Sequence, residues 1–424
     1  MSDVDDDLVE GDLVEVTVGA PAHGGHCVAR IGGPHGRVVF VRHALPGERV
    51  TVEVTEVHRG YLRGDAVEIH EASPDRVTPP CPYARPGGCG GCDLQHVADR
   101  AQLDWKAAVV REQLARPGGL SAAQIDELSV RVQPLPGGTL GWRSRVRYAV
   151  DAAGRAGLLQ HRSHQVVPID RCRIALPVVQ QLDVTSRRWP SEAAIEVVAS
   201  TGGDVSILAH PAGSGAPDDD PRDMSDAPDG PVLDGPAEAL ELAAGRRWLV
   251  PVAGFWQVHP AAADTLVTAV LDLLEPVAGE TAWDLYGGAG LFAAAVAERT
   301  GARVTVVESS PVGVAAARAN LADLAGVEVV SAKVDTALAR RRITGPVDIV
   351  VLDPPRTGAG GRVVRGIVAA DPRAVAYVAC DPASLGRDIA TFADAGWRLA
   401  ELRAFDCFPM TQHVECVALL VPGV

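Results

Sequence analysis

The sequence lacks the features that would place a protein in a membrane or outside the cell. No run of 18 apolar residues occurs in the 424-residue chain, so neither a transmembrane helix nor a membrane partner is expected. Residues 1–15 contain seven acidic side chains and neither lysine nor arginine, whereas a secretory signal starts with basic residues before an apolar core. We therefore predict a cytoplasmic protein, and the sequence indicates no obligate protein partner.

An excess of positive charge is also lacking, since the formal net charge is −15. Residues 1–15 carry a net charge of −7 and residues 211–236 a net charge of −6, which leaves −2 for the rest of the chain. The cations of that remainder are almost all arginine, whose guanidinium group can form paired hydrogen bonds to phosphate. Net charge therefore neither supports nor excludes an RNA partner, because a local patch decides that interaction.

The first half of the chain is irregular in pattern. Residues 12–69 contain short β-branched stretches separated by glycine- and proline-containing turns, which indicates a small β-barrel. Residues 99–116 carry apolar side chains at helical spacing, and residues 130–209 mix short strands with a helical stretch near 177–188. Residues 211–236 are rich in Asp, Pro and Gly, and we expect them to be disordered.

From residue 254 onward, short apolar stretches alternate with helical ones, which predicts an α/β fold with a parallel sheet covered on both faces. DLYGGAGLF (284–292) places glycines between a strand and a helix, where the backbone at Gly288 can approach a ligand. Glu308 ends the next strand, at a position where an acid commonly binds ribose hydroxyls. A tight turn with a capping acid is the structural alternative, and the G-x-G-x-x-G pattern of nicotinamide enzymes is absent.

A second carboxylate follows a later strand in VVLDPPRTG (350–358). The two prolines after Asp353 form a rigid, extended exit that can hold the carboxylate against a planar substrate. The alternative is a simple strand stop. Together with the glycine-rich turn, this segment indicates an S-adenosylmethionine-dependent methyltransferase.

The motifs and their order resemble one enzyme family. They are FWQVHP (255–260), DLYGGAGLF, LDPPRTG (352–358), ACDPASLGRD (379–388) and DCFPMTQHVECVALL (406–420). This combination resembles the RNA uracil-5-methyltransferases, which make 5-methyluridine in 23S ribosomal RNA and in tRNA. The resemblance spans nearly the whole chain and implies S-adenosylmethionine as cofactor and a class I, doubly wound catalytic domain. It also implies that the cofactor and base sites are lined by Gln257, Tyr286, Glu308, Asp335 and Asp353.

Uracil methylation explains why a cysteine is needed. C5 of uracil is a poor nucleophile, and a thiolate that adds to C6 converts the ring into an enolate that can accept the methyl group at C5. Cys380 ends an apolar stretch just before a helix expected at 383–395, whose N-terminus would lower the pKa of the thiol. The resemblance assigns Glu415 as the base that removes the C5 proton. A core position for Cys380 and an exposed strand end for Glu415 are the structural alternatives.

Two positions depart from the family pattern. The family often has cysteine where Gly287 stands and asparagine where Asp381 follows the nucleophile. Gly287 removes a side chain that has no part in the reaction above. Asp381 places a carboxylate beside the thiolate, which opposes ionisation of the thiol unless the carboxylate is hydrogen-bonded.

Four further cysteines form a candidate metal site. CPYARPGGCGGCDLQH (81–96) has the spacing C-x7-C-x2-C, and one more cysteine lies far downstream. Without a secretory signal, clustered cysteines more often bind metal or do chemistry than form disulfides. Four thiolates suit zinc or an iron–sulfur cluster, and the spacing does not separate the two. Some members of the family carry a [4Fe–4S] cluster on this pattern, which favours that cluster over zinc. The expected ligands are Cys81, Cys89, Cys92 and Cys172.

We therefore expect three domains. Residues 8–69 resemble the family's TRAM domain, an OB-like RNA-binding barrel, and residues 70–250 form a mixed α+β central domain with the cysteines and the acidic insertion. Residues 251–424 form the catalytic domain. The predicted reaction is methylation of uracil C5 in RNA, with 23S rRNA favoured because bacterial-type tRNA enzymes of the family generally lack the barrel and the cluster. The alternatives are a tRNA uracil-5-methyltransferase and a non-catalytic RNA-binding protein of the same fold.

Overall fold

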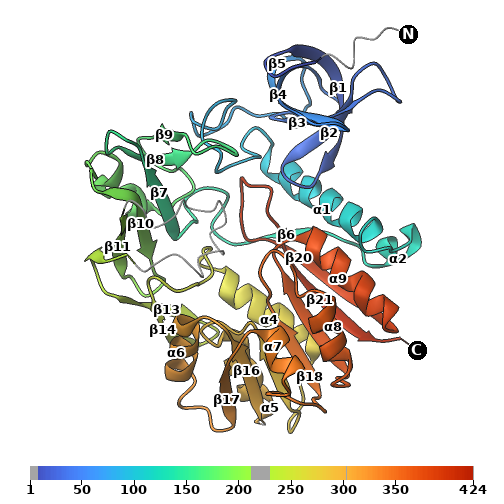
Figure 1. Cartoon of the computed structure of the whole chain (residues 1–424), viewed down its shortest axis with the longest axis vertical. Coiled ribbons are helices and arrows are strands. Elements are labelled where there is room, and N and C mark those ends of the chain that lie inside the picture. Colours follow the sequence, from blue (N-terminus) through green and yellow to red (C-terminus); the bar gives the residue numbers. More distant parts are fainter. Residues whose placement is uncertain (1–7, 212–229, 302, 424) are drawn as a thin grey trace.

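The protein is built from a closed barrel, a six-stranded sheet and an eight-stranded sheet, joined by helices and loops (Figure 1). The structure is a computed structural model of the chain and describes residues 8–211, 230–301 and 303–423. Most of the acidic segment 211–236, which we expected to be disordered, lies outside these residues. None of the helices in the described part of the chain is both long and apolar enough to span a bilayer.

The N-terminal unit is a five-stranded barrel in the order β1-β2-β3-β5-β4. Alternate residues of β4 point inward, so that Val50, Val52 and Val54 are buried while their neighbours face solvent. The small β-barrel predicted from the sequence is confirmed. The strands are β1 (Leu13–Ala22), β2 (His26–Arg30), β3 (Val38–Arg42), β4 (Arg49–Val57) and β5 (Tyr61–Glu71).

Helix α1 (Asp99–Ala115) lies between the barrel and the catalytic sheet (Figure 1). Trp105 and Val109 on one side of it pack into the barrel core, and Val110 and Leu114 pack into the core beneath the catalytic sheet. The helix expected at 99–116 is therefore confirmed, and it joins the two units through one shared element. The short helix α2 (Ala122–Glu127) follows, with a capping box at Ser121.

The central unit contains an antiparallel sheet in the order β12-β11-β10-β7-β8-β9 and a separate hairpin, β13-β14. Strand β12 lies inside the segment expected to be disordered and pairs with β11. The strands are β7 (Arg145–Val150), β8 (Ala156–Leu159), β9 (Val166–Pro168), β10 (Glu192–Ala199), β11 (Val205–Pro211), β12 (Val232–Asp234), β13 (Glu238–Ala243) and β14 (Arg246–Pro251). The helices are α3 (Pro177–Gln180) and the 3-10 turn η1 (Asp183–Thr185).

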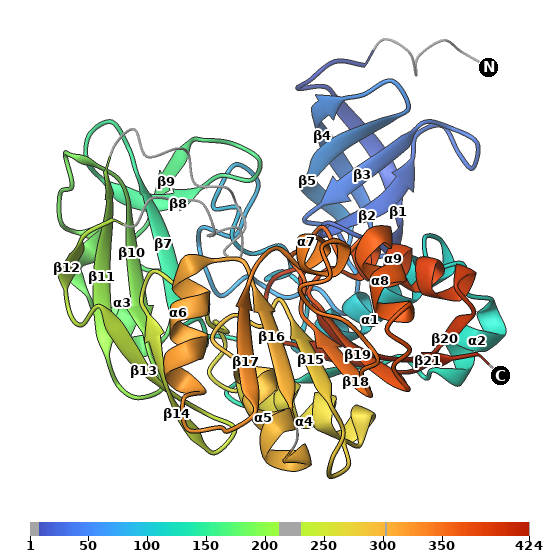
Figure 2. The same cartoon turned by 60° about the horizontal axis from the view of Figure 1, so that its bottom comes forward.

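The catalytic sheet has the order β17-β16-β15-β18-β19-β21-β20-β6. Five parallel strands are followed by antiparallel β21, and helices cover both faces (Figure 2). The predicted doubly wound α/β fold is confirmed. The strands are β15 (Ala282–Leu285), β16 (Val304–Glu308), β17 (Val327–Ser331), β18 (Ile349–Leu352), β19 (Ala374–Ala379), β20 (Trp397–Asp406) and β21 (Glu415–Pro422). The helices are α4 (Ala262–Leu274), α5 (Leu291–Thr300), α6 (Pro311–Asn320), α7 (Val334–Ala339), α8 (Gly361–Val368) and α9 (Pro382–Asp394).

The eighth strand of this sheet comes from much earlier in the chain. Strand β6 (Val132–Pro134) pairs in parallel with β20, with Val132 opposite Ala404. It lies within residues 70–250, which we expected to form the central domain, as does α1. The chain thus leaves the catalytic sheet after Pro134 and returns to it at α4.

Candidate active site

Strand pairing brings Cys380 and Glu415 together. Strand β19 pairs antiparallel with β21, and the last pair of the ladder is Ala379 opposite Cys416. Continuing this register by one residue places Cys380 opposite Glu415. Side chains directly opposite each other on antiparallel strands share a face, with Cβ atoms roughly 5 Å apart. Glu415 is only 1% exposed, so it is no exposed strand end, while Cys416 is buried in the core on the other face.

Asp353 follows the adjacent strand, β18, whose ladder with β19 ends at Leu352 opposite Tyr377. The loop that begins at Asp353 is fixed at its far end by Asp388, a buried acid of α9. Its carboxylate accepts hydrogen bonds from the backbone of Ala359 at 2.8 Å and from the Tyr377 hydroxyl at 2.7 Å. Sequence reasoning missed Asp388, although an acid on the buried face of an apolar helix was a visible signal.

The carboxylate beside the proposed nucleophile has partners on both oxygens. Asp381 caps α9, accepting at Oδ1 from the backbone N–H of Ser384 at 2.8 Å. Its Oδ2 lies 2.8 Å from Nε2 of His23, which belongs to the barrel. Burial works to raise the pKa of Asp381, but the hydrogen bond and charge of His23 and the Ser384 N–H together hold it below its usual value. The sequence predicted that Asp381 would oppose ionisation of the neighbouring thiol unless its carboxylate were hydrogen-bonded. The structure shows that this carboxylate is hydrogen-bonded.

The glycine-rich turn after β15 is shaped by left-handed backbone. Tyr286 has a φ of 63° and Gly288 a φ of 52°. Glu308, at the end of β16, binds this turn, because its Oε2 accepts from the backbone N–H of Gly288 at 2.9 Å. Its Oε1 accepts from the N–H groups of Ser309 and Ser310 at 2.7 and 2.6 Å. A carboxylate has about four lone-pair sites, so Glu308 can still accept from a ligand.

A buried acid under the same turn was not among the predicted site residues. Asp284 is 1% exposed, and its Oδ2 accepts from the backbone N–H of Ala293 at 2.8 Å. Within the described part of the chain, its Oδ1 has no hydrogen-bond partner. Burial raises the pKa of Asp284 to about 7. The charge of Glu308 adds to this shift, and the hydrogen bond from Ala293 opposes it. An acid inside the apolar strand TAWDL was the signal that could have identified it.

Asp335 and Gln257 are the remaining predicted cofactor residues. Asp335 sits in the first turn of α7, 3.3 Å from the guanidinium of Arg362, and its charge contributes to raising the pKa of Tyr286, after burial and Asp388. Gln257 is half-buried in the segment between β14 and α4. The carboxyl ends of neighbouring parallel strands thus carry Tyr286, Glu308 and Asp353, and ligands bind at this end in open α/β sheets.

The segment between β20 and β21, which leads to Glu415, is anchored on α1. Lys106 is fully buried, and its ammonium group donates to Asp406 at 2.5 Å and to the Phe408 carbonyl at 3.0 Å. Gln102, one turn earlier, accepts from the backbone N–H of Met410 at 3.0 Å. A buried charge needs such pairing, so this ion pair ties the helix to the catalytic sheet.

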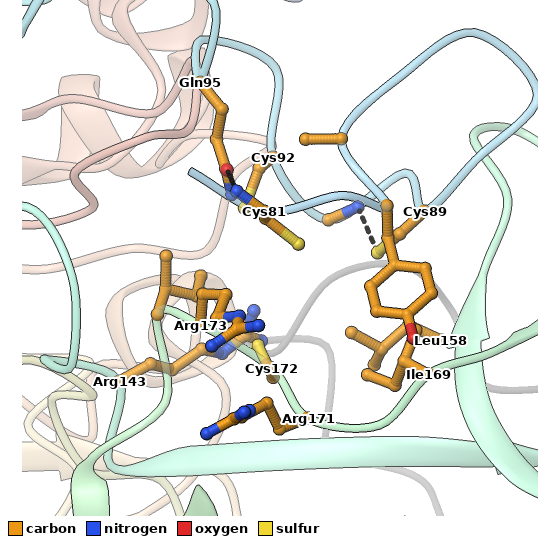
Figure 3. Close-up of a pocket in the computed structure, with 14 residues that line it drawn as sticks. Cys81, Cys89, Cys92, Gln95, Arg143, Leu158, Ile169, Arg171, Cys172 and Arg173 are labelled. Carbon is orange, nitrogen blue, oxygen red and sulfur yellow. Dashed lines mark hydrogen bonds between the residues drawn. The ribbon is translucent and has the colours of Figure 1, made fainter. Parts of the chain in front are cut away.

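The four clustered cysteines line a single pocket between the loop 81–92 and the central sheet (Figure 3). Their thiols face one another across it, although 80 residues separate Cys92 from Cys172 in the sequence. Within the loop, the backbone N–H of Gly91 points at the Sγ of Cys89, 3.4 Å away. The pocket also has a cationic side, formed by Arg143, Arg171 and Arg173. We call this site the cysteine pocket.

The environment of the cysteine pocket opposes free thiolates. Burial is the main cause that raises the pKa of Cys89 to about 12 and those of Cys92 and Cys172 above their ordinary values. The negative charges of neighbouring cysteines add to this shift, and Arg143 acts against it at Cys89 and Cys172. Among the described residues, no group of three or more His, Cys, Asp or Glu side chains could hold a metal ion as they stand.

His96 ends the cysteine segment but does not line the pocket. It is buried against His43, with ring centroids 5.9 Å apart, and its Nε2 lies 3.4 Å from the Ala44 carbonyl. Burial, followed by the charge of Arg76, lowers its pKa to about 4. His96 therefore packs as a neutral side chain.

Comparison with known proteins agrees with this architecture. The TRAM domain family matches residues 8–67, and the family tRNA (Uracil-5-)-methyltransferase matches residues 251–422. An uncharacterized RNA methyltransferase of Streptomyces avermitilis is 48% identical, over 97% of this chain and 99% of its own length. One from Streptomyces coelicolor is 47% identical, over 97% of this chain and 93% of its own length.

A solved structure shares the whole fold. The Pyrococcus abyssi tRNA (uracil-54, C5)-methyltransferase, in complex with S-adenosyl-L-homocysteine, matches with a TM-score of 0.69 at 23% identity. The match covers 96% of this chain and 99% of that one. The barrel, the catalytic sheet and the full-length relatives lead to one assignment: the chain belongs to the RNA methyltransferases of the tRNA (uracil-5-)-methyltransferase family that carry a TRAM domain.

Proposed function

We propose that this enzyme methylates C5 of a uridine in RNA, using S-adenosylmethionine, with Cys380 as nucleophile and Glu415 as base. The observation that carries the proposal is the β19–β21 register, which sets these two buried side chains opposite each other. Asp353 directly follows the adjacent parallel strand, β18, and so stands at the same end of the sheet as Cys380. A thiol paired with a carboxylate suits addition to C6 and proton removal from C5.

Cys380 and Glu415 each have one task in the proposed reaction. The Cys380 thiolate bonds to C6, and the ring electrons move to the C4 carbonyl as an enolate. C5 of the enolate then bonds to the methyl carbon of S-adenosylmethionine, whose carbon–sulfur bond breaks so that neutral S-adenosylhomocysteine leaves. Glu415 removes the C5 proton, the C5–C6 double bond re-forms, and the thiolate leaves. Because Cys380 directly precedes the N-cap of α9, the positive end of the helix dipole favours the thiolate.

The turn after β15 fits S-adenosylmethionine. A Cβ added at Gly288 would meet no described atom within 4 Å, so space remains above this turn. The unpartnered Oδ1 of Asp284 and the remaining lone pair of Glu308 offer acceptors beside it. We assign cofactor binding to the residues predicted from the sequence, which are Gln257, Tyr286, Gly288, Glu308, Asp335 and Asp353, and we add Asp284.

We assign a [4Fe–4S] cluster to the cysteine pocket, with zinc as the alternative. Such a cluster takes four thiolates around a multi-iron core. Four thiols line this pocket, and the flanking arginines balance negative charge. Because the reaction above includes no oxidation or reduction, we assign the cluster of Cys81, Cys89, Cys92 and Cys172 to structure or RNA binding.

The barrel offers a surface on which RNA bases can stack. Half-buried Phe40 and Tyr61 meet edge to face with ring centroids 5.4 Å apart, and His58 stacks on Tyr61 at 4.4 Å. The guanidinium of Arg63 lies 5.6 Å from the centre of the Tyr61 ring. Aromatic rings beside arginine are typical of sites for unpaired bases. We name Phe40, His58 and Tyr61 the barrel aromatic patch.

We favour 23S rRNA as the substrate, with tRNA as the alternative.

RNA that contains 5-fluorouridine tests the chemistry, because fluorine at C5 cannot be removed as a proton and the enzyme should remain bonded to C6. With S-adenosylmethionine, we expect a denaturation-resistant protein–RNA adduct that Cys380→Ala cannot form. Glu415→Gln should accumulate the covalent intermediate on natural RNA. An adduct formed by Cys380→Ala would refute the assigned nucleophile, and intact RNA binding without any methyl transfer by the wild type would indicate a non-catalytic RNA-binding protein.

The choice between the two RNA classes needs a separate experiment. Purified 23S rRNA and tRNA from a strain lacking this enzyme can be incubated with it and S-adenosylmethionine, then mapped by mass spectrometry. We expect new 5-methyluridine in 23S rRNA. Methylation restricted to tRNA would refute the favoured substrate while leaving the chemistry intact.

A further inference from the structure

A turn of the barrel contacts the catalytic domain at Asp381, the residue that follows Cys380. It lies between β1 and β2, and its His23 meets Oδ2 of Asp381 at 2.8 Å across 358 residues of sequence. The next residue, Gly24, donates its backbone N–H to Oε1 of Gln412 at 3.1 Å. Gln412 lies just before β21, so the turn touches both strand ends that carry the proposed catalytic pair.

The turn is held in place by close packing. Gly24 and Gly25 have φ values of 98° and 76°, which L side chains rarely adopt. A Cβ on Gly25 would lie 2.8 Å from the side chain of Asp93. Asp93 in turn accepts from the backbone N–H of Gln412 at 3.1 Å. The histidine is therefore presented by a fixed turn wedged between the cysteine segment and the catalytic loop.

The charge of Asp381 acts on a thiol of the neighbouring strand. The pKa of the buried Cys416, on the neighbouring strand, is raised first by burial and then by the charges of Glu415 and Asp381. Cys380 adjoins Asp381 in the chain. An unbalanced carboxylate at this position would stabilise the protonated thiol and slow formation of the nucleophile.

We propose that His23 is a positioning residue for the reaction: it holds the Asp381 carboxylate and offsets its charge, so that the adjacent Cys380 can act as a thiolate. This inference rests on the proposed role of Cys380. The two oxygens of Asp381 divide their tasks, since Oδ1 caps α9 through Ser384 and Oδ2 binds the barrel. The barrel thus acts on catalysis through the seating of one side chain, besides any contact with RNA.

Other charged groups near the contact act on the same equilibrium. Glu415 faces the site from β21 and opposes ionisation of the thiol, as Asp381 does. On the barrel side, His26 is held neutral, since burial followed by the charge of Arg42 lowers its pKa to about 3. Arg42 is itself 3.4 Å from Asp93. Among these groups, His23 is the one in direct contact with Asp381.

The test is the pH dependence of adduct formation with 5-fluorouridine RNA and S-adenosylmethionine. For His23→Ala, we expect the pH of half-maximal rate to rise by about one unit, because an uncompensated nearby carboxylate shifts a pKa by that order. The double variant His23→Ala/Asp381→Asn should return to the profile of Asp381→Asn, because asparagine keeps the helix cap without the charge. Gln412→Ala, which breaks the adjacent contact but removes no charge, should leave the midpoint in place.

The outcomes are distinguishable. An unchanged pH midpoint for His23→Ala would refute the inference. A double variant as impaired as His23→Ala alone would refute it too. An equal shift of the midpoint for Gln412→Ala would also refute it, because it would show that only the docking of the barrel matters. Cys380→Ala serves as the reference at every pH. If it forms the adduct, the proposed function fails; if it does not, a negative His23 result overturns only the positioning role.

Discussion

The catalytic centre and the cysteine pocket use the same side chain in opposite ways. Cys380 stands at the end of a strand in a regular ladder, opposite an acid and before a helix N-terminus. The cysteines of the pocket come from an irregular loop and from a segment 80 residues further on, with arginines around them. The thiol of Cys380 is placed by secondary structure, whereas the four pocket thiols are placed by tertiary packing. The contrast shows that strand pairing alone can bring one cysteine beside an acid, whereas the pocket needs the packing of distant segments.

The largest expected effect separates the two regions directly. Cys380→Ala should lower the methylation rate by about 10³-fold or more, since the covalent route is lost. Iron content and thermal stability should stay close to those of the wild type, because the pocket is untouched. Methylation counted by transfer of a labelled methyl group, beside iron analysis of the same sample, measures both. Cys416→Ala is the matched control on the neighbouring strand, and loss of iron with Cys380→Ala would break the comparison.

The converse variant is Cys92→Ser. Anaerobically purified wild type should be brown with about four irons per chain, and this variant should lose the iron and melt at a lower temperature. Cys27→Ser is the matched control, because Cys27 is equally buried but lies in the barrel. Stoichiometric zinc in the wild type would refute the assigned cluster in favour of a zinc site. Full iron content in Cys92→Ser would show that this cysteine is not a ligand.

Lys106→Met tests the connection between α1 and the catalytic sheet. It leaves Asp406 as a buried charge without its partner, which costs about 3–5 kcal/mol of stability. Urea unfolding measures the loss. Lys106→Met/Asp406→Asn should recover part of it, because the uncompensated charge is gone. A single variant within about 0.5 kcal/mol of the wild type would show that α1 does not depend on this pair.

The smallest expected effect concerns the barrel aromatic patch. Tyr61→Ala should weaken binding of single-stranded RNA by about 1–3 kcal/mol, the usual value for one stacked base. Fluorescence anisotropy at fixed salt measures the dissociation constant, and Tyr61→Phe should retain most of the affinity. Unchanged affinity in Tyr61→Ala would move RNA contact away from this face.

Much of the catalytic half could be predicted from sequence, because its elements obey local rules. Apolar stretches alternate with helical ones there, and Asp353, Cys380 and Glu415 each stand where a strand begins or ends. The pairing partner of Glu415 could not be predicted, because strand order is a tertiary property. The roles we assign to these residues remain predictions until the variants are measured.

The remaining features of the structure could not be predicted from the sequence, because their contacts join distant parts of the chain. Strand β6 is three residues long and carries no repeating pattern that would reveal it. His23 and Asp381 look unrelated in the sequence, and only the docking of the barrel joins them. Lys106 on α1 was similarly hidden, since one charge on an amphipathic helix is normally solvated.

Strand β6 also defines how this chain can change. Because the chain leaves the catalytic sheet after Pro134 and comes back at α4, the stretch between them is a detour with both ends fixed on one scaffold. The length and sequence of such a detour can change without reordering the strands of the catalytic sheet. Residues 135–251 can therefore vary while the strand order on either side of Cys380 stays the same.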